Sequence, residues 1–211
     1  MLQALLVALA LQNPDANAIL DRSIAAYRRV TTLRADFTQA LRDPMIGTDD
    51  TSYGELFQRR PDRFAMRWTR PRGDLLVVDG SYLWLYLPSS VPNQVVKSAV
   101  SGRPGQSPDV IAEFLDAPRE RFTVAYVGSQ SVGGRSADVL SFTPKQANAP
   151  YRRVVLWLDT QDHLPHQFEI TEASGAVRRV TLSRLRVNTA IPASTFTFRA
   201  PAGVRVVDAS Q

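Results

Sequence analysis

The segment from Tyr53 to Pro88 constrains the fold of this chain more than any other part of the sequence. It is a series of short, aromatic-rich runs separated by Arg-Pro, Pro-Arg-Gly and Asp-Gly, which favour turns. The turns are too frequent for a helix, and the large apolar side chains are too many for a sheet exposed on both faces. The segment therefore predicts a strongly curved antiparallel sheet with one face reserved for apolar contacts.

A two-residue period of apolar and polar side chains continues over most of the chain. Strands are expected at 33–41, 52–59, 62–69, 74–79, 82–87, 93–99, 120–127, 137–142, 152–159, 165–172, 176–187 and 194–199. Their spacing fits a barrel or a strongly bent sheet, and nothing repeats at the period of a solenoid or a propeller. The predicted fold class is therefore mainly β (α+β), with antiparallel strands.

Two segments have a helical pattern instead. Leu20, Ile24 and Tyr27 recur at i, i+4 and i+7, which predicts a first helix over 13–30 with Asn13 as its N-cap. Because this apolar stripe must be covered, we expect the helix to pack on the neighbouring sheet.

A second, shorter helix is expected over 108–118, in the middle of the chain. Ile111, Phe114 and Leu115 share one face of it, and Pro118 is expected to end it. A helix of this length is not stable without packing, so its apolar face must also be covered.

Length and composition indicate one globular domain, which we assign to residues 11–211. The chain has 211 residues, of which 44% are hydrophobic and 21% charged. Residues 1–10 are a short apolar run that ends in Ala-Leu-Ala, a pattern that suits signal-peptide cleavage after Ala10. No stretch approaches the roughly 20 apolar residues of a membrane-spanning helix. We therefore expect a secreted, soluble protein.

Charge and cysteine content exclude several classes of function. The formal net charge of +5 suggests nucleic acid or anionic lipid as a partner. The arginines are scattered as pairs, however, and no RNP, helix-turn-helix or zinc-finger motif is present, so we expect no nucleic-acid partner. The chain has no cysteine, which excludes disulfides, thiol catalysis, cysteine-ligated metal and an N-terminal lipidated cysteine.

Polar residues that could catalyse a reaction do not converge in any motif. His163 and His166 are three residues apart, but Pro165 between them excludes a helix, so we interpret them as surface histidines beside a turn. The sequence has no P-loop and no G-x-G-x-x-G motif. We expect neither an enzyme nor a cofactor or metal site.

Apolar residues are more informative than the polar ones. Phe64, Met66 and Trp68 alternate onto one face of their strand, whereas the strand at 82–87 is apolar on both faces. Burial on both faces means either that both are covered or that one lines a cavity. The residues alone leave both alternatives open: a core packed against the helices, or an apolar pocket that accepts chains of variable shape.

Several segments, in the same order along the chain, resemble the LolA family of periplasmic outer-membrane lipoprotein carriers. They are LRADFTQ at 33–39, GEL at 54–56 with RP at 60–61, Phe64 and Trp68, LVVDG at 76–80 with LWLY at 83–86, and FTFRAPAGV at 196–204. Each segment alone is a weak signal, but together they span nearly the whole chain.

The resemblance implies an incomplete, strongly curved antiparallel β-barrel, with an N-terminal helix and a short lid helix over a hydrophobic cavity. It implies a monomeric periplasmic carrier that needs no cofactor. Its expected partners are acylated lipoproteins, an inner-membrane lipoprotein-releasing ABC transporter and, where present, an outer-membrane receptor. The alternatives are a sensor of mislocalised lipoproteins with the same fold, and a carrier of another lipid such as a glycolipid.

The resemblance also assigns roles to individual residues. The family's arginine before proline, matched here by Arg60, latches the lid by hydrogen bonds to helix carbonyl groups. Arg60 shares strand parity with Leu56, so alternation places both on one face. The implied cavity lining is Leu56, Phe64, Met66, Trp68, Val78 and Trp84, and the implied lid face is Ile111, Phe114 and Leu115.

Overall fold

The protein is built on one highly curved sheet, seen in a computed structural model that describes residues 14–45, 47–100 and 111–209. The expected signal peptide at 1–10 lies outside the described residues. The strands are β1 (Thr32–Asp43), β2 (Thr48–Arg59), β3 (Arg63–Arg70), β4 (Leu75–Asp79), β5 (Tyr82–Tyr86), β6 (Gln94–Ala99), β7 (Phe122–Val132), β8 (Arg135–Pro144), β9 (Tyr151–Asp159), β10 (Pro165–Glu172), β11 (Val177–Val187) and β12 (Arg205–Asp208). Among the described residues, no helix is long and apolar enough to cross a membrane.

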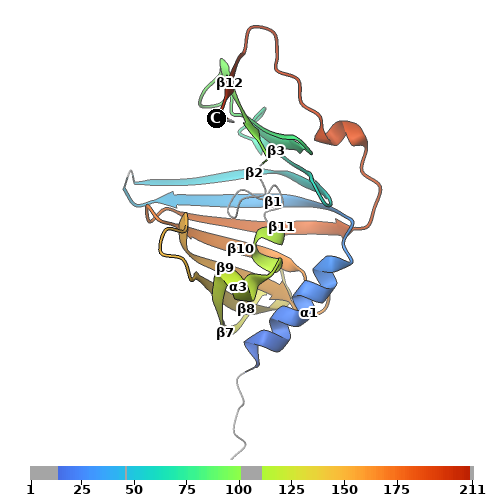
Figure 1. Cartoon of the computed structure of the whole chain (residues 1–211), viewed down its shortest axis with the longest axis vertical. Coiled ribbons are helices and arrows are strands. Elements are labelled where there is room, and N and C mark those ends of the chain that lie inside the picture. Colours follow the sequence, from blue (N-terminus) through green and yellow to red (C-terminus); the bar gives the residue numbers. More distant parts are fainter. Residues whose placement is uncertain (1–13, 46, 101–110, 210–211) are drawn as a thin grey trace, which may run out of the picture.

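The order of the strands makes the sheet an incomplete barrel, as predicted. The order is β12-β6-β5-β4-β3-β2-β1-β11-β10-β9-β8-β7, so the two outermost strands do not pair with each other. Every neighbouring pair is antiparallel except β12 with β6, which is parallel. Figure 1 shows the helices that precede β7 in the chain in front of the lower strands of the sheet, and the C-terminal segment running past the ends of β1 to β3 to reach β12.

The first helix, α1 (Ala16–Arg28), starts slightly later than predicted. Its N-cap is Asp15, whose Oδ1 accepts a hydrogen bond from the backbone N–H of Asn17 at 2.9 Å. The predicted cap, Asn13, lies outside the described residues. The helix buries Ile19, Leu20, Ser23 and Tyr27 against the sheet.

The second predicted helix is shorter than expected, and another short helix follows it. Within the described part of the 108–118 segment, α2 (Ala112–Leu115) ends before the predicted position, and α3 (Pro118–Arg121) follows it. Pro118 therefore begins a helix instead of ending one, which suits proline because the first helical N–H has no partner within the helix. Ala117, between the helices, has a left-handed conformation with φ of 46°.

The two faces of the sheet have separate apolar clusters. The concave face carries the main cluster, which includes α1, α2 and residues from most strands. The outer face of β2 to β4 carries a smaller one of Phe57, Ala65, Val77, Ile191 and Phe196. The strand predicted at 194–199 is wrong, because residues Ala193–Phe196 form a 3₁₀ helix, η1, that buries Phe196 against this outer face. The short β12 that follows was not predicted.

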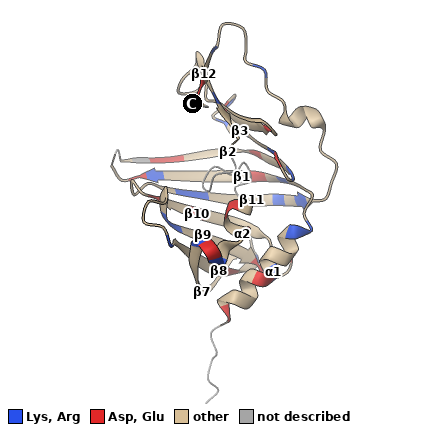
Figure 2. Ribbon diagram, viewed as in Figure 1, with Lys and Arg blue, Asp and Glu red and all other residues tan. Residues whose placement is uncertain are grey.

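Charged residues of both signs are distributed along most of the chain. Figure 2 shows Lys and Arg interspersed with Asp and Glu along β1, β2, β11 and α1. Many arginines are paired, for example Arg179 with Glu169 at 2.6 Å and Arg34 with Glu55 at 2.6 Å. Both of these arginines are about half exposed, so they belong to a solvated surface of mixed charge.

Candidate functional site

The concave face brings most of the predicted cavity residues together with the predicted lid. Leu56, Phe64, Met66 and Val78 are between 0% and 8% exposed, and they belong to one buried cluster. The same cluster contains the three lid residues Ile111, Phe114 and Leu115, which are 2% to 4% exposed. The short helix α2 therefore lies on the concave face with its apolar side chains inward.

Strand register explains why these residues share a face. Leu56 of β2 is opposite Met66 of β3, and Phe64 of β3 is opposite Val78 of β4. Directly opposite residues in an antiparallel sheet project to the same side, so alternation in one strand fixes the face of the next. Alternation and register therefore place these four residues on one face, and that this face lines a lipid cavity stays a prediction.

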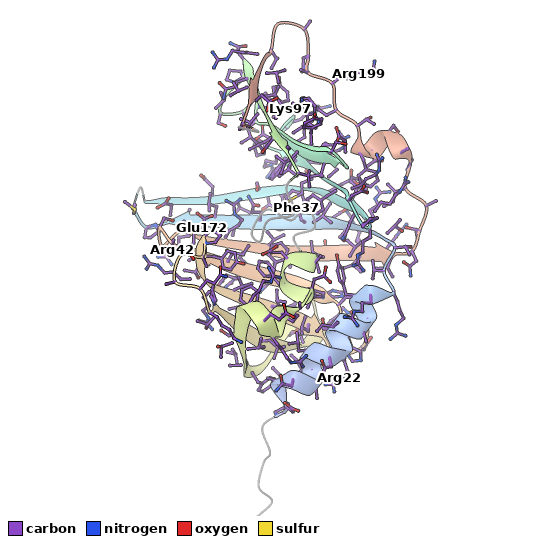
Figure 3. All side chains as sticks on the ribbon, in the orientation of Figure 1. Arg22, Phe37, Arg42, Lys97, Glu172 and Arg199 are labelled. Carbon is purple, nitrogen blue, oxygen red and sulfur yellow. The ribbon has the colours of Figure 1, made fainter. Side chains whose placement is uncertain are left out.

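Trp68 lies at the margin of the cluster and is half-buried. Its ring makes an edge-to-face contact with Phe37, with the ring centroids 5.4 Å apart. Phe37 is labelled in Figure 3, where it lies at the middle of the curved sheet. The indole Nε1 of Trp68 donates to Ser52 Oγ at 3.2 Å, which ties the ring to β2.

Trp84 does not join the other predicted cavity residues. It is opposite Val77, which belongs to the outer cluster, and its ring centroid lies 5.7 Å from that of Phe198. The concave neighbour of Val78 is instead Leu83, which packs against the main cluster. This placement corrects the prediction for Trp84. The strand at 82–86 is apolar on both faces, so its composition does not show which face is the inner one. The pairing of Val78 with Leu83 does show it.

An aromatic group beneath α2 was missed by the sequence analysis. Phe114 contacts Phe122 and Tyr151, with centroid distances of 6.1 Å and 5.8 Å, and Phe122 contacts Phe142 at 5.8 Å. Burial, and to a lesser degree the nearby Glu113 carboxylate, raise the pKa of Tyr151 to about 12. The sequence did carry a signal for this group. Phe122 and Phe142 both lie in strands that the apolar alternation predicts, and Phe122 follows shortly after the predicted lid helix.

Arg60 contacts the first helix from the turn that follows β2. Its Nη1 donates to the carbonyl oxygen of Tyr27 at 3.2 Å, and its guanidinium lies 4.8 Å from the centre of the Tyr27 ring. These contacts secure the C-terminal end of α1, where a cation also interacts favourably with the helix dipole. A hydrogen bond from Arg60 to the lid stays a prediction.

Two buried oxygens between α1 and the sheet have no hydrogen-bond partner within the described residues. They are Ser23 Oγ and Gln58 Oε1. Gln58 is 1% exposed, and its Nε2 donates to the hydroxyl of Tyr27. An unsatisfied buried polar group costs about 1–3 kcal/mol, so this interface is less stable than an equally packed apolar one.

A cluster of Asp159, Asp162 and His166 has the residue types of a metal site, with possible ligand atoms within 4.8 Å of one another. Asp159, however, already accepts hydrogen bonds from Arg135 at 2.6 Å and 2.7 Å and from the backbone N–H groups of the following turn. Burial opposes ionisation, but these donors outweigh it and hold the pKa of Asp159 well below its usual range. Together with Arg135, the cluster is therefore a network of ion pairs and hydrogen bonds that fixes the turn between β9 and β10.

His166 within this cluster is 8% exposed and lies 2.9 Å from Asp162 Oδ2. Its burial corrects the interpretation of His166 as a surface residue. His163 is partly buried in the same turn and has a positive φ of 60°.

Comparison with known proteins supplies evidence that geometry alone does not. Residues 28–199 match the family model described as "Outer membrane lipoprotein carrier protein LolA". The outer-membrane lipoprotein carrier protein of Bordetella avium is 30% identical over 206 residues, which cover 98% of this chain and 93% of the relative. The corresponding protein of Chromobacterium violaceum is 26% identical, over 98% of this chain and 96% of the relative.

Solved structures share the fold at lower sequence identity. An uncharacterised conserved protein of Thermus thermophilus aligns with a TM-score of 0.58 and 17% identity, over 92% of this chain and 98% of that one. The MucA/MucB complex of Pseudomonas aeruginosa contains a chain with a TM-score of 0.52 and 19% identity; the alignment covers 92% of this chain and 63% of that one. At these identities the likeness is one of fold.

Proposed function

Because the chain belongs to the LolA family of outer membrane lipoprotein carriers, we propose that it takes acylated lipoproteins from an inner-membrane ABC transporter and delivers them to the outer membrane. In this proposal the protein works in the periplasm, and the concave face of the sheet holds the acyl chains. The observation that carries the proposal is the single apolar cluster formed by Leu56, Phe64, Met66 and Val78 with α2.

The size of the hydrophobic effect explains why such a carrier is needed. Each acyl methylene group contributes about 0.8 kcal/mol when it is buried, so several long chains left in water would cost tens of kcal/mol. A lipoprotein cannot leave its membrane at a useful rate unless an apolar surface receives its chains. In the proposal, the concave face receives the acyl chains once α2 and its side chains move aside.

Release requires that the closed state be stable, but only moderately. The unsatisfied oxygens of Ser23 and Gln58 make the contact between α1 and the sheet less favourable. Arg60 offsets part of this cost through its contacts with Tyr27. We propose that the lid residues Ile111, Phe114 and Leu115 and the acyl chains compete for the same apolar surface, and that Arg60 favours the closed state.

A release assay tests the proposal. Purified protein is added to spheroplasts that hold newly made, labelled lipoproteins, in the presence of the transporter from the same organism. We expect a one-to-one complex of protein and lipoprotein in the soluble fraction. If the folded protein releases no lipoprotein, the carrier proposal fails, and the sensor and the glycolipid carrier become the remaining alternatives.

Neighbouring residues of β5 provide matched variants for this assay. Leu83 faces the concave cluster and Trp84 faces the outer one. Leu83→Ser should therefore reduce recovery of the complex, whereas Trp84→Ser should leave it close to the wild-type level. Far-UV circular dichroism checks that both variants are folded. Equal losses in both variants would contradict the assignment of the concave face as the binding surface.

A further inference from the structure

The lid helix carries a carboxylate in the middle of an apolar environment. All four residues of α2 are buried, and Glu113 among them is only 9% exposed. A charge removed from water is costly unless it is paired and hydrogen-bonded. The partners of Glu113 therefore help to determine how firmly the lid helix is held.

Arg121 is a charged partner of Glu113. Its Nη1 lies 2.6 Å from Glu113 Oε1, and its Nη2 donates to the carbonyl oxygen of Glu113 and, at 3.1 Å, to that of Asp116. The Tyr151 hydroxyl donates to the same Glu113 oxygen at 3.3 Å. The guanidinium fork thus holds both the side chain and the backbone of the lid helix.

The residues that hold Glu113 are themselves anchored to the sheet: Arg121 ends α3 and leads directly into β7. The carbonyl oxygen of Arg121 accepts a hydrogen bond from the backbone N–H of Lys145 at 2.9 Å, and the next residue, Phe122, pairs with Pro144 of β8. Tyr151 is the first residue of β9. The ion pair therefore connects a short helix to a rigid part of the molecule. The side chains of Arg121 and Glu113 are 25% and 10% exposed, so water screens their attraction only weakly.

The link between α2 and α3 has the properties of a hinge. Asp116 and Ala117 are both exposed, so their side chains are not held by packing. Ala117 has φ and ψ of 46°, a left-handed conformation that is uncommon for residues other than glycine. A movement of α2 away from the sheet about this link breaks the bonds from the Arg121 side chain to Glu113 and Asp116, but leaves the Arg121 backbone paired with Lys145.

We infer that Glu113 and Arg121 are positioning residues that fasten the lid helix to the sheet, and that Asp116 and Ala117 form the hinge about which α2 leaves the apolar cluster. The use of this movement to admit acyl chains rests on the proposed carrier function. The fastening itself does not, and can be measured without any lipid. Weakening the ion pair raises the population of the open lid, so bound acyl chains dissociate faster.

Hydrogen–deuterium exchange measures the fastening directly. In α2, the amide of Phe114 donates to Ile111 at 3.1 Å and the amide of Asp116 donates to Ala112 at 2.8 Å, so both are protected while the helix is closed. Glu113→Gln and Arg121→Gln should each accelerate exchange in this segment roughly ten- to hundred-fold, because charge-assisted hydrogen bonds are lost. Exchange in the central strands β1 and β2 should stay unchanged.

Arg119→Gln is the matched control. Arg119 also lies in α3, but its guanidinium contacts Asn17 and Asp21 of α1, at 3.1 Å and 2.8 Å. Its removal should leave exchange in α2 at the wild-type rate. Arg121→Lys retains the positive charge but loses the several N–H donors of the guanidinium group, so exchange in α2 should have an intermediate rate. If only the charge mattered, Arg121→Lys would exchange at the wild-type rate.

Unchanged exchange in α2 for both Glu113→Gln and Arg121→Gln would overturn the inference. If either variant unfolds, Tyr151→Phe removes a single hydrogen bond to Glu113; a smaller local acceleration supports the fastening, and no acceleration refutes it. Dissociation of a synthetic triacylated cysteine lipopeptide is measured in parallel. Faster exchange together with no lipopeptide binding by any variant, the wild type included, would retain the fastening and refute the carrier function.

Discussion

Replacing Gly54 with alanine should destabilise the protein, because the space that a side chain would need is occupied. Gly54 of β2 is opposite Phe37 of β1, and a Cβ atom added to it would lie 2.6 Å from two atoms of the Phe37 ring. It would be closer still to the carbonyl oxygen of Arg67. Phe37 cannot retreat freely, since it packs edge-to-face on Trp68.

The magnitude follows from the nature of the two clashes. Overpacking a well-packed core costs about 1–3 kcal/mol. One of the two obstacles here is backbone, which a rotamer change cannot move, so we expect Gly54→Ala to lie at the upper end, about 3 kcal/mol. For a chain of this length, a loss of that size lowers the melting temperature by roughly 6–12 °C.

Urea denaturation of the wild type, Gly54→Ala, Phe37→Leu and the double variant gives the required comparison. Phe37→Leu removes the ring from the path of the new Cβ but leaves the Arg67 carbonyl in place. The double variant should therefore lose about 1 kcal/mol less free energy of unfolding than the sum of the losses in the two single variants. If Gly54→Ala stays within about 0.5 kcal/mol of the wild type, the reasoning is refuted.

Three further predictions concern other parts of the fold. Asp159→Asn should lower the free energy of unfolding by about 2 kcal/mol at pH 7, because the bonds to Arg135 are weakened. The pKa of Asp159 is depressed in the folded state, so the advantage of the wild type should hold above the unfolded pKa near 3.8 and decline as the pH falls below it. Urea denaturation of both proteins at pH 3 and pH 7 checks this. Phe196→Ala should lower the free energy of unfolding by about 3–5 kcal/mol, since the Phe196 ring is 0% exposed. A smaller loss, measured by thermal unfolding, would mean that the C-terminal segment contributes little to stability. Asn188→Ala should cost about 2 kcal/mol, because Oδ1 accepts from the Thr31 backbone at 2.8 Å and Nδ2 donates to the Arg29 carbonyl at 3.1 Å; an unchanged denaturation midpoint would show that α1 needs no such anchor.

Local alternation was enough to predict most of the strands and the face that carries much of the candidate site. Phe64 and Met66 have only Arg and Ala as neighbours in their strand, which marks the inner face, and the register carries this face to Leu56 and Val78. The apolar stripe of α1 was equally clear, because Leu20 and Tyr27 recur at helical spacing and both are buried.

What the sequence did not reveal depends on contacts between distant segments. Trp84 is covered by Phe198, a residue more than a hundred positions away, so nothing near Trp84 indicates that its face is the outer one. The Phe-Thr-Phe alternation at 196–198 resembles a strand, yet Phe196 is buried through a 3₁₀ helix. Between Arg34 and Asp36, the pairing of β1 with β11 shifts register, so Leu182 and Leu185 both face inward although simple alternation separates them.

The parallel pairing of β12 with β6 has a consequence for the order in which the molecule assembles. Val206 is opposite Val95, so the outer edge of β6 has no partner until a segment made about a hundred residues later becomes available. A contact between such distant positions closes a long loop and gains little until its ends meet, which makes it slow to form. Newly made chains should therefore pass through a stage in which β6 is a bare edge strand. In the finished protein, the four-residue strand β12 should be the first part of the sheet to detach and the last to return.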